Sequence, residues 1–254
     1  MPRLLTYNVH RCVGTDKRLD VARIVAVIAE HEPDIVCLQE LDVGRARTGG
    51  VDQAEAIAAG LEMSFHFNAA MLIEAEEYGD ALLTRRPERL IRKGALPTMR
   101  GIPGLEPRGA VWAAIDFDGV EVNVINTHLG LVPREQRLQA AALTGKDWLG
   151  HAQCVGPTIL TGDFNATSIT RPYQTLTRGL ADCQRQLGLR QTVKTFPSGF
   201  PAIRIDHAFV SPHIRVTRVT APFSPLARVA SDHLPLVIDF EIDGHAPVSA
   251  RATG

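Results

Sequence analysis

The sequence of 254 residues lacks several features that mark particular classes of protein. No apolar run approaches the length of a membrane-spanning helix, and strand-like residues begin at Leu4 with no signal-peptide layout before them. The four cysteines are scattered and form no Cys-x-x-Cys pair, and two of them, Cys12 and Cys37, lie in or beside expected strands. We therefore expect free thiols in a reducing compartment, and a cytoplasmic protein.

The sequence also lacks an excess of positive charge, since 27 Lys and Arg residues face 28 Asp and Glu residues for a formal net charge of −1. A protein without a global basic field is not expected to bind nucleic acid tightly through its phosphates. The basic region of note lies at residues 85–108. We expect most of its side chains on a solvated surface, whereas Arg108, beside Gly109 at the start of a strand, is expected to contact substrate.

Neither a short internal repeat nor a linker-like change of composition divides the chain. We expect a single domain over residues 1–244 and a loose tail over residues 245–254, where no apolar pattern remains. Apolar alternation and apolar runs predict strands, and apolar residues at helical spacing predict helices. The expected strands lie at 3–9, 34–38, 65–67, 81–84, 111–117, 120–124, 158–160, 205–210 and 234–238, and the expected helices at 21–30, 52–60, 133–148 and 171–179.

Polar side chains occupy the ends of these expected strands. The strand ends carry Asn8, Glu40, His128 and Asp163, and the strand starts carry Asp206, Asp232 and His233. Taken one at a time, each residue favours an ordinary turn or a solvated strand end. In a mixed sheet, however, the ends of some strands and the starts of others share one edge, so we expect these side chains to converge on one rim.

With Asn165, that rim would hold four carboxylates, two amides and two imidazoles. Carboxylates that crowd together repel one another by several kcal/mol unless a cation joins them. An oxygen-rich site without thiols suits Mg²⁺ or Mn²⁺ better than Zn²⁺. A hard divalent cation beside imidazoles and amides is what in-line attack on a phosphate ester requires.

Six short motifs follow one another along nearly the whole chain. They are Thr6-Tyr7-Asn8-Val9, Leu38-Gln39-Glu40, Asn126-Thr127-His128-Leu129, Gly162-Asp163-Phe164-Asn165, Arg204-Ile205-Asp206 and Ser231-Asp232-His233. In this order they resemble the motifs of the endonuclease/exonuclease/phosphatase superfamily, which includes deoxyribonuclease-I-like nucleases, inositol-phosphate phosphatases and sphingomyelinases. The resemblance implies the α/β (α+β) class and a four-layer α/β/β/α sandwich, in which two mixed sheets pack face to face with helices outside. It also implies Mg²⁺-dependent (or Mn²⁺-dependent) hydrolysis of phosphoesters.

The resemblance further implies a role for each matching residue. Glu40 is similar to the main metal ligand, with Asn8 and Asp232 nearby. Asp163 is similar to the residue that orients or deprotonates the attacking water, and Asn165 to the amide that holds the developing oxyanion.

Three more matching residues concern the phosphoryl group and the leaving group. His233 is similar to the imidazole that polarises the phosphoryl group, and Asp206 to the carboxylate that orients a histidine. His128 is similar to the second histidine of the deoxyribonuclease-I-like branch, which implies an acid for the leaving group.

Around these motifs, Arg108, Tyr78 and Arg204 are the residues expected to contact substrate. Tyr78-Gly79-Asp80 departs from the Tyr-Gly-Asn form expected of the superfamily, and His207 stands where many relatives have tyrosine. The loop at 190–204 also carries Phe196 and Phe200, for which packing under the loop is the alternative to substrate contact.

The superfamily does not fix the substrate. The first hypothesis is a metal-dependent phosphodiesterase or phosphatase that acts on a small or lipid-derived phosphate. The second is a DNA or RNA nuclease, and the third, from another class, is a catalytically inactive binding module on the same fold. The intact set of Glu40, Asp163, Asn165, Asp232 and His233 argues against the third. The oligomeric state and the preferred ion stay open.

Overall fold

Two six-stranded β-sheets form the centre of the protein, whose computed structural model describes residues 1–99, 102, 104–188 and 192–243. The first sheet runs in the order β11 (Ile214–Thr220), β12 (Leu236–Ile242), β1 (Arg3–Asn8), β2 (Ile35–Val43), β4 (Glu76–Thr84) and β3 (Ser64–Ile73). The second runs in the order β5 (Glu88–Ala95), β6 (Gly109–Phe117), β7 (Val120–His128), β8 (Thr158–Asp163), β10 (Asp206–Val210) and β9 (Ala181–Asp182).

Both sheets are mixed in the same way. In the first sheet β1 and β2 are parallel, in the second β7 and β8 are parallel, and every other described pair is antiparallel. A parallel pair at the centre of each sheet brings two strand ends to the same edge. The antiparallel neighbours then bring strand starts to that edge as well.

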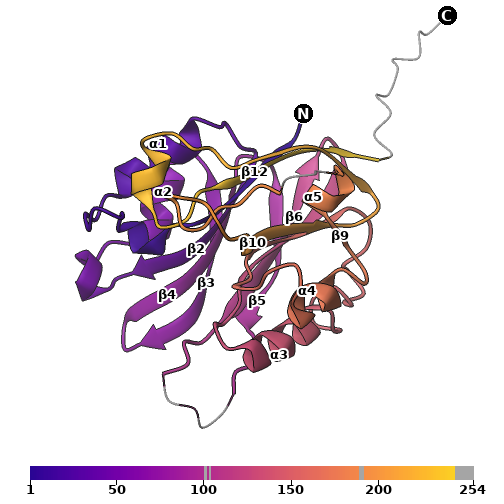
Figure 1. The fold of residues 1–254 in the computed structure, drawn as a ribbon, viewed down its shortest axis with the longest axis horizontal. Helices are drawn as coiled ribbons and strands as arrows, with labels where there is room; N and C mark the ends of the chain where they lie inside the picture. The colour runs from indigo at the N-terminus through magenta and orange to yellow at the C-terminus, as the bar shows by residue number, and fades with distance from the viewer. Residues whose placement is uncertain (100–101, 103, 189–191, 244–254) are drawn as a thin grey trace, which may run out of the picture.

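The helices lie outside the two sheets (Figure 1). They are α1 (Val21–Ala29), α2 (Gln53–Leu61), α3 (Pro133–Leu143), α4 (Arg171–Leu176), α5 (Cys183–Gln186) and α6 (Ala227–Ala230), together with the 3₁₀ turns His10–Cys12 and Ala46–Thr48. Three apolar clusters define the layers: one between the sheets, one under α1, α2 and α6, and one under α3 and α4. The architecture is a four-layer α/β sandwich, as the resemblance implies.

Side-chain alternation along the strands explains these layers. Leu4 of β1 points into the cluster between the sheets, and Leu5 points into the cluster under the helices. In β6 the same alternation sends Val111 between the sheets and Trp112 toward α3 and α4. Because a strand turns successive residues to opposite faces, strands buried on both faces read as nearly continuous apolar runs.

Most predicted elements are confirmed, with corrections at their ends. The helix expected over 133–148 ends at Leu143 and is followed by turns, and the helix expected over 171–179 ends at Leu176. Residues 88–95, which belong to the basic region, form edge strand β5. The expected tail at 245–254 and Arg100 lie outside the described residues. All four cysteines are free thiols, as expected, and no helix among the described residues is long and apolar enough to cross a membrane.

Candidate active site

Sheet register alone brings three of the predicted residues into one row. His128 and Asp163 are the last residues of β7 and β8, and they pair directly because these strands run parallel. Asp206, the first residue of β10, pairs with Asp163 across an antiparallel ladder. All three side chains are buried, with exposed fractions of 1–2%. Two carboxylates opposite each other on one sheet repel, so this row requires a positive partner.

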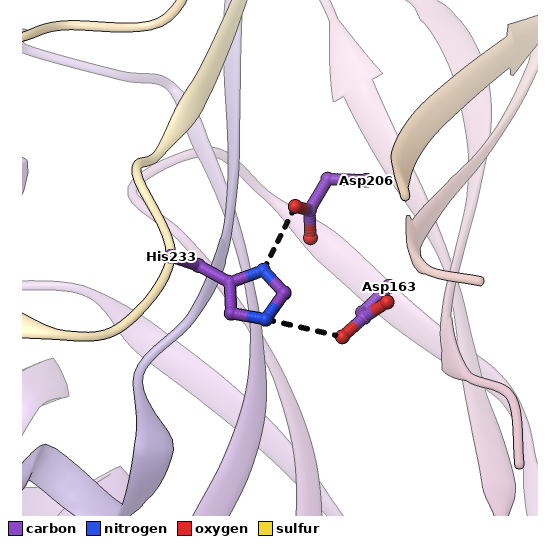
Figure 2. Close-up of side chains that lie close together, drawn as sticks. All are labelled: Asp163, Asp206 and His233. Atoms are coloured by element: carbon purple, nitrogen blue, oxygen red, sulfur yellow. Dashed lines mark hydrogen bonds and ion pairs between the residues drawn. The ribbon is translucent and has the colours of Figure 1, made fainter. Parts of the chain in front are cut away.

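His233 is that partner (Figure 2). Its Nδ1 lies 2.9 Å from Asp206 Oδ2, and its Nε2 lies 3.6 Å from Asp163 Oδ2. Burial alone would lower the pKa of His233, but the carboxylates of Asp206 and Asp163 outweigh burial and raise it to about 10. The ring is therefore an imidazolium at neutral pH, held between two carboxylates.

Neighbouring groups fix this imidazolium in place. The Thr195 hydroxyl donates a hydrogen bond to Asp206 Oδ2, the same oxygen that His233 contacts. The ring of Phe196 packs on His233 with centroids 4.9 Å apart. The loop aromatic at 196 thus supports the site from behind its histidine, whereas Phe200 is 80% exposed.

Asp163 is poised between its charged and neutral forms. Burial raises its pKa to about 7, Asp206 acts in the same direction, and His233 together with hydrogen bonds from Asn165 and Asn8 opposes both. One carboxylate oxygen, Oδ1, accepts the Asn165 backbone N–H at 2.8 Å, and Oδ2 accepts Asn8 Nδ2 at 3.0 Å. A carboxylate with a pKa near neutral is suited to accept a proton from water.

A tight approach between β7 and β8 places the loop that carries Asn165. At Gly162 the backbone has φ of +139°, and a Cβ there would lie 1.8 Å from the Thr127 carbonyl oxygen, so glycine is required. Asn165 itself has φ of +47°, its Nδ2 donates to Leu129 O at 3.0 Å, and its own carbonyl accepts Gln136 Nε2 at 2.8 Å. The amide is therefore held rigidly beside the row.

His128 differs from His233 in its charge. Arg108 Nη1 lies 3.1 Å from His128 Nδ1 and Asn165 Nδ2 lies 3.0 Å from His128 Nε2, so each ring nitrogen faces a donor group and a neutral ring accepts from one of them. That Nε2 lies 3.5 Å from Asp163 Oδ2. Burial first, then Arg108 and His233, lower the pKa of His128 well below its usual value. A neutral imidazole can donate a hydrogen bond to an oxyanion from its protonated nitrogen, and the role of leaving-group acid that the resemblance implies for His128 stays a prediction.

The first sheet contributes Asn8 and Glu40 to the same rim. Asn8 Nδ2 donates both to Asp163 Oδ2 and to Glu40 Oε1, at 3.0 and 2.9 Å, and so links the two sheets. Glu40 lies in a bulge of β2, where the pairing with β4 shifts between Leu38 and Leu41 and φ of Glu40 is +61°. The bulge turns the Glu40 carboxylate toward Asn8.

Two buried amides that the sequence analysis did not single out support this bulge. Asn126 of β7 reaches across to the first sheet, where its Nδ2 donates to the carbonyls of Leu38 and Ala81, each at 2.8 Å. Gln39 Nε2 donates in turn to Asn126 Oδ1 at 2.7 Å. Both residues lie within the quoted motifs, but nothing in the sequence distinguishes a polar side chain that points between two sheets from one that points to solvent.

Asp80 is a further buried acid near Glu40. Burial raises its pKa to about 8, Arg108 opposes that rise, and the charge of Glu40 adds to it. The departure from the Tyr-Gly-Asn pattern thus places a carboxylate, 2% exposed, where the expected form has an amide. Tyr78 is also buried, and burial followed by the charges of Glu40 and Glu106 raises the pKa of its phenol.

Three predicted residues lie less centrally. Arg204 is buried and its Nη2 bonds to Asp182, so its guanidinium is held in the protein interior and not at the row. His207 donates from Nε2 to Ala166 O at 2.7 Å and supports the loop after Asp163 from behind. Asp232 has a side chain 40% exposed, and its Oδ1 lies 4.0 Å from His10 Nδ1.

The donor set of this rim fits a hard divalent cation. The carboxylates of Glu40 and Asp163 both accept hydrogen bonds from the Asn8 amide. They therefore bring carboxylate oxygens together, and no thiol is among the described residues in these contacts. By contrast, Asp163, Asp206 and His233 bring ligand atoms within 4.8 Å of one another, but the protonated ring already supplies their positive charge. Glu40 and Asn8 are therefore the better candidates for a metal.

Comparison with known proteins found a matching family, similar sequences and similar structures. The model of the Endonuclease/Exonuclease/phosphatase family matches residues 5–233. The uncharacterized protein YbhP of Escherichia coli is 24% identical over 94% of this chain and 96% of its own. An endonuclease/exonuclease/phosphatase from Beutenbergia cavernae has a TM-score of 0.72 at 25% identity, over 98% of this chain and 73% of that one. A mannosyl-6-phosphatase of Bacteroides thetaiotaomicron has a TM-score of 0.75 at 20% identity, over 95% and 100%, which shows a shared fold.

Proposed function

The chain belongs to the endonuclease/exonuclease/phosphatase family, and we propose that it is a Mg²⁺- or Mn²⁺-dependent hydrolase of phosphoester bonds in small or lipid-derived phosphates. The observation that carries the proposal is the row of His128, Asp163, Asp206 and His233, which meets Asn8 and Glu40 at one rim. A row with one carboxylate near neutral pKa and one imidazolium combines a base with a fixed positive charge.

Each side chain of the row has a task in hydrolysis. Asp163 orients the attacking water and accepts its proton, since its raised pKa of about 7 lies near neutral pH. The His233 imidazolium attracts the phosphoryl oxygens, and Asp206 keeps that ring charged and oriented. His128 and Asn165 adjoin each other at the row, with Nε2 and Nδ2 3.0 Å apart, and they donate hydrogen bonds to the oxygens on which charge develops.

Glu40 and Asn8 are the residues that would hold a divalent cation, and Asp232 would be a further ligand. When bound, such a cation would neutralise charge on the phosphoryl oxygens and the leaving group.

The charges of the basic region at residues 85–108 favour a small substrate over a nucleic acid strand. In the basic region, Arg86 pairs with Asp34 at 3.2 Å, and Arg89 pairs with Glu121 at 3.1 Å. Arg108 is likewise engaged, by His128 and by Glu106 at 2.9 Å. Arginines with acidic partners offer little free positive charge to a phosphate backbone. A mannosyl-6-phosphatase of Bacteroides thetaiotaomicron shares this fold, which also supports a small ester, and a DNA or RNA nuclease stays the alternative.

A substrate panel tests the proposal. Initial rates would be measured with Mg²⁺ and with Mn²⁺ on sugar monophosphates, bis(4-nitrophenyl) phosphate, a phospholipid in micelles, and plasmid DNA. We expect turnover of a small or lipid-derived ester with kcat/KM well above that for plasmid cleavage. Fast nicking of plasmid with slow turnover of every small ester would favour the nuclease, and turnover of none would favour the inactive binding module.

A further inference from the structure

A hollow of ≈ 290 Å³ opens directly beside Asn165. Its size is near the lower end for ligand pockets, which start at roughly 300 Å³, so it takes one chemical group and not a whole large ligand. Asn165 lines the hollow with its exposed part while its Nδ2 lies 3.0 Å from His128 Nε2. A substrate bound at the catalytic row can therefore extend into the hollow without leaving the row.

The hollow has the opposite charge to the protein as a whole. Two arginines line it, Arg137 and Arg171, and no carboxylate is among the described residues that do so. Both arginines are exposed, and neither guanidinium has an ion pair or a side-chain hydrogen bond with any other described residue. This distinguishes them from Arg89 and Arg92 of β5, whose guanidinium groups lie 3.1 and 3.6 Å from acidic partners.

The two arginines come from elements that are fixed relative to each other. Arg137 lies in the second turn of α3, above Pro133, which also lines the hollow, and Arg171 is the first residue of α4. These helices pack against each other on the second sheet (Figure 1). Beneath them Gln136 is buried and bonds to the carbonyls of Gly130 and Asn165, both at 2.8 Å, so the floor is tied to the catalytic loop.

We propose, on the basis of the function proposed above, that this hollow binds a second phosphate group of a small substrate, so that the enzyme prefers bisphosphorylated to monophosphorylated esters. One guanidinium group can bind two phosphate oxygens at once. Two guanidinium groups together match the double negative charge of a phosphate monoester. Because the hollow takes a single group, and Arg108, which contacts His128 of the row, has an acidic partner in Glu106, the occupant is a small molecule and not a polynucleotide.

The test compares substrates that differ by one phosphate. Steady-state kcat/KM would be measured with Mg²⁺ for fructose 6-phosphate against fructose 1,6-bisphosphate, and for inositol 1-phosphate against inositol 1,4-bisphosphate. Dissociation constants for the same pairs would be measured by calorimetry on the Asp163→Asn variant in Mg²⁺. In each pair the bisphosphate should have a kcat/KM roughly 10- to 100-fold higher and a dissociation constant lower by a similar factor, as expected for charge-assisted hydrogen bonds.

Arg137→Gln and Arg171→Gln should each reduce that preference by roughly 10-fold, because each removes one guanidinium. Arg134→Gln is the matched control, since Arg134 is an exposed arginine of the same helix that does not line the hollow, and it should keep the preference intact. If wild type shows no preference for the bisphosphate, or if the preference survives both substitutions, the inference is wrong. It is also wrong if the two arginines raise kcat/KM or affinity for oligonucleotides alone. If the protein binds the bisphosphates more tightly than the monophosphates but hydrolyses no ester, the proposed function is wrong and the second-phosphate site is supported.

Discussion

Replacing Asp206 by asparagine should uncouple the charge of His233 from the rest of the site. Among the groups that raise the pKa of His233 from 6.5 to about 10, Asp206 is the largest contributor. At 1.36 kcal/mol per pKa unit, that rise corresponds to roughly 5 kcal/mol of preference for the imidazolium. Without Asp206, Asp163 and Asp232 are the carboxylates left to oppose burial, so we expect the pKa of His233 to fall to neutral or below.

The sign of the effect on activity follows from the role of the ring. The charged ring is present below its pKa and lost as pH rises through it, so wild-type kcat/KM should hold until about pH 10 on the alkaline side. On the acid side it should increase as Asp163 loses its proton near pH 7. In Asp206→Asn the alkaline limb should move down by about 3 units or more, with a loss of roughly 10-fold or more at pH 8.

The assay is a pH profile of kcat/KM, with the His233 ring titrated by NMR in parallel. Thr195→Val is the matched control, because it removes the hydroxyl that bonds to the same Asp206 oxygen but keeps the charge, and its alkaline limb should move by less than about 1 unit. An unchanged alkaline limb in Asp206→Asn, or equal shifts in both variants, would refute the account of His233 as an imidazolium set by Asp206.

Three other changes test separate parts of the site. Glu40→Gln should weaken Mg²⁺ binding by about 10-fold or more in calorimetry, because the charged oxygen ligand is lost, and an unaltered affinity would remove Glu40 from the metal site. His128→Ala should slow nitrophenyl and alkyl esters to a similar degree, since a neutral ring donates a hydrogen bond and transfers no proton; a loss confined to alkyl esters would restore the acid role. Asn126→Ala should lower the free energy of unfolding by roughly 1–3 kcal/mol in denaturant titrations, because the buried carbonyls of Leu38 and Ala81 lose their donor; full stability would show that those carbonyls find other donors.

The strands and the row could be predicted because both depend on strand periodicity, whereas the four-layer sandwich is what the family resemblance implies. Apolar runs and apolar alternation locate β1, β2, β6, β7 and β8, and the residues at their ends then share an edge wherever parallel and antiparallel pairs meet. Asn8, His128, Asp163 and Asp206 meet in this way.

The direction of long side chains could not be predicted. Arg204 and Arg108 both stand beside a predicted strand start, but Arg204 turns inward to Asp182 while Arg108 reaches His128. That choice depends on partners distant in the chain, as does the charge of His128, whose pKa is lowered by burial first and then by Arg108. The bulge at Glu40 also lacks a local signal, since the donor that stabilises it is Asn126, 88 residues from Leu38.

One measurement tests the central claim most directly. Product release from the best ester of the panel would be followed in wild type and in Asp163→Asn, first with Mg²⁺ and then with a chelator. We expect turnover that requires the cation and falls by about 10²–10⁴-fold in Asp163→Asn, with substrate affinity nearly retained, because the variant keeps the shape of the side chain but cannot accept the proton of water. Turnover that persists in the chelator, or that Asp163→Asn leaves intact, would contradict it.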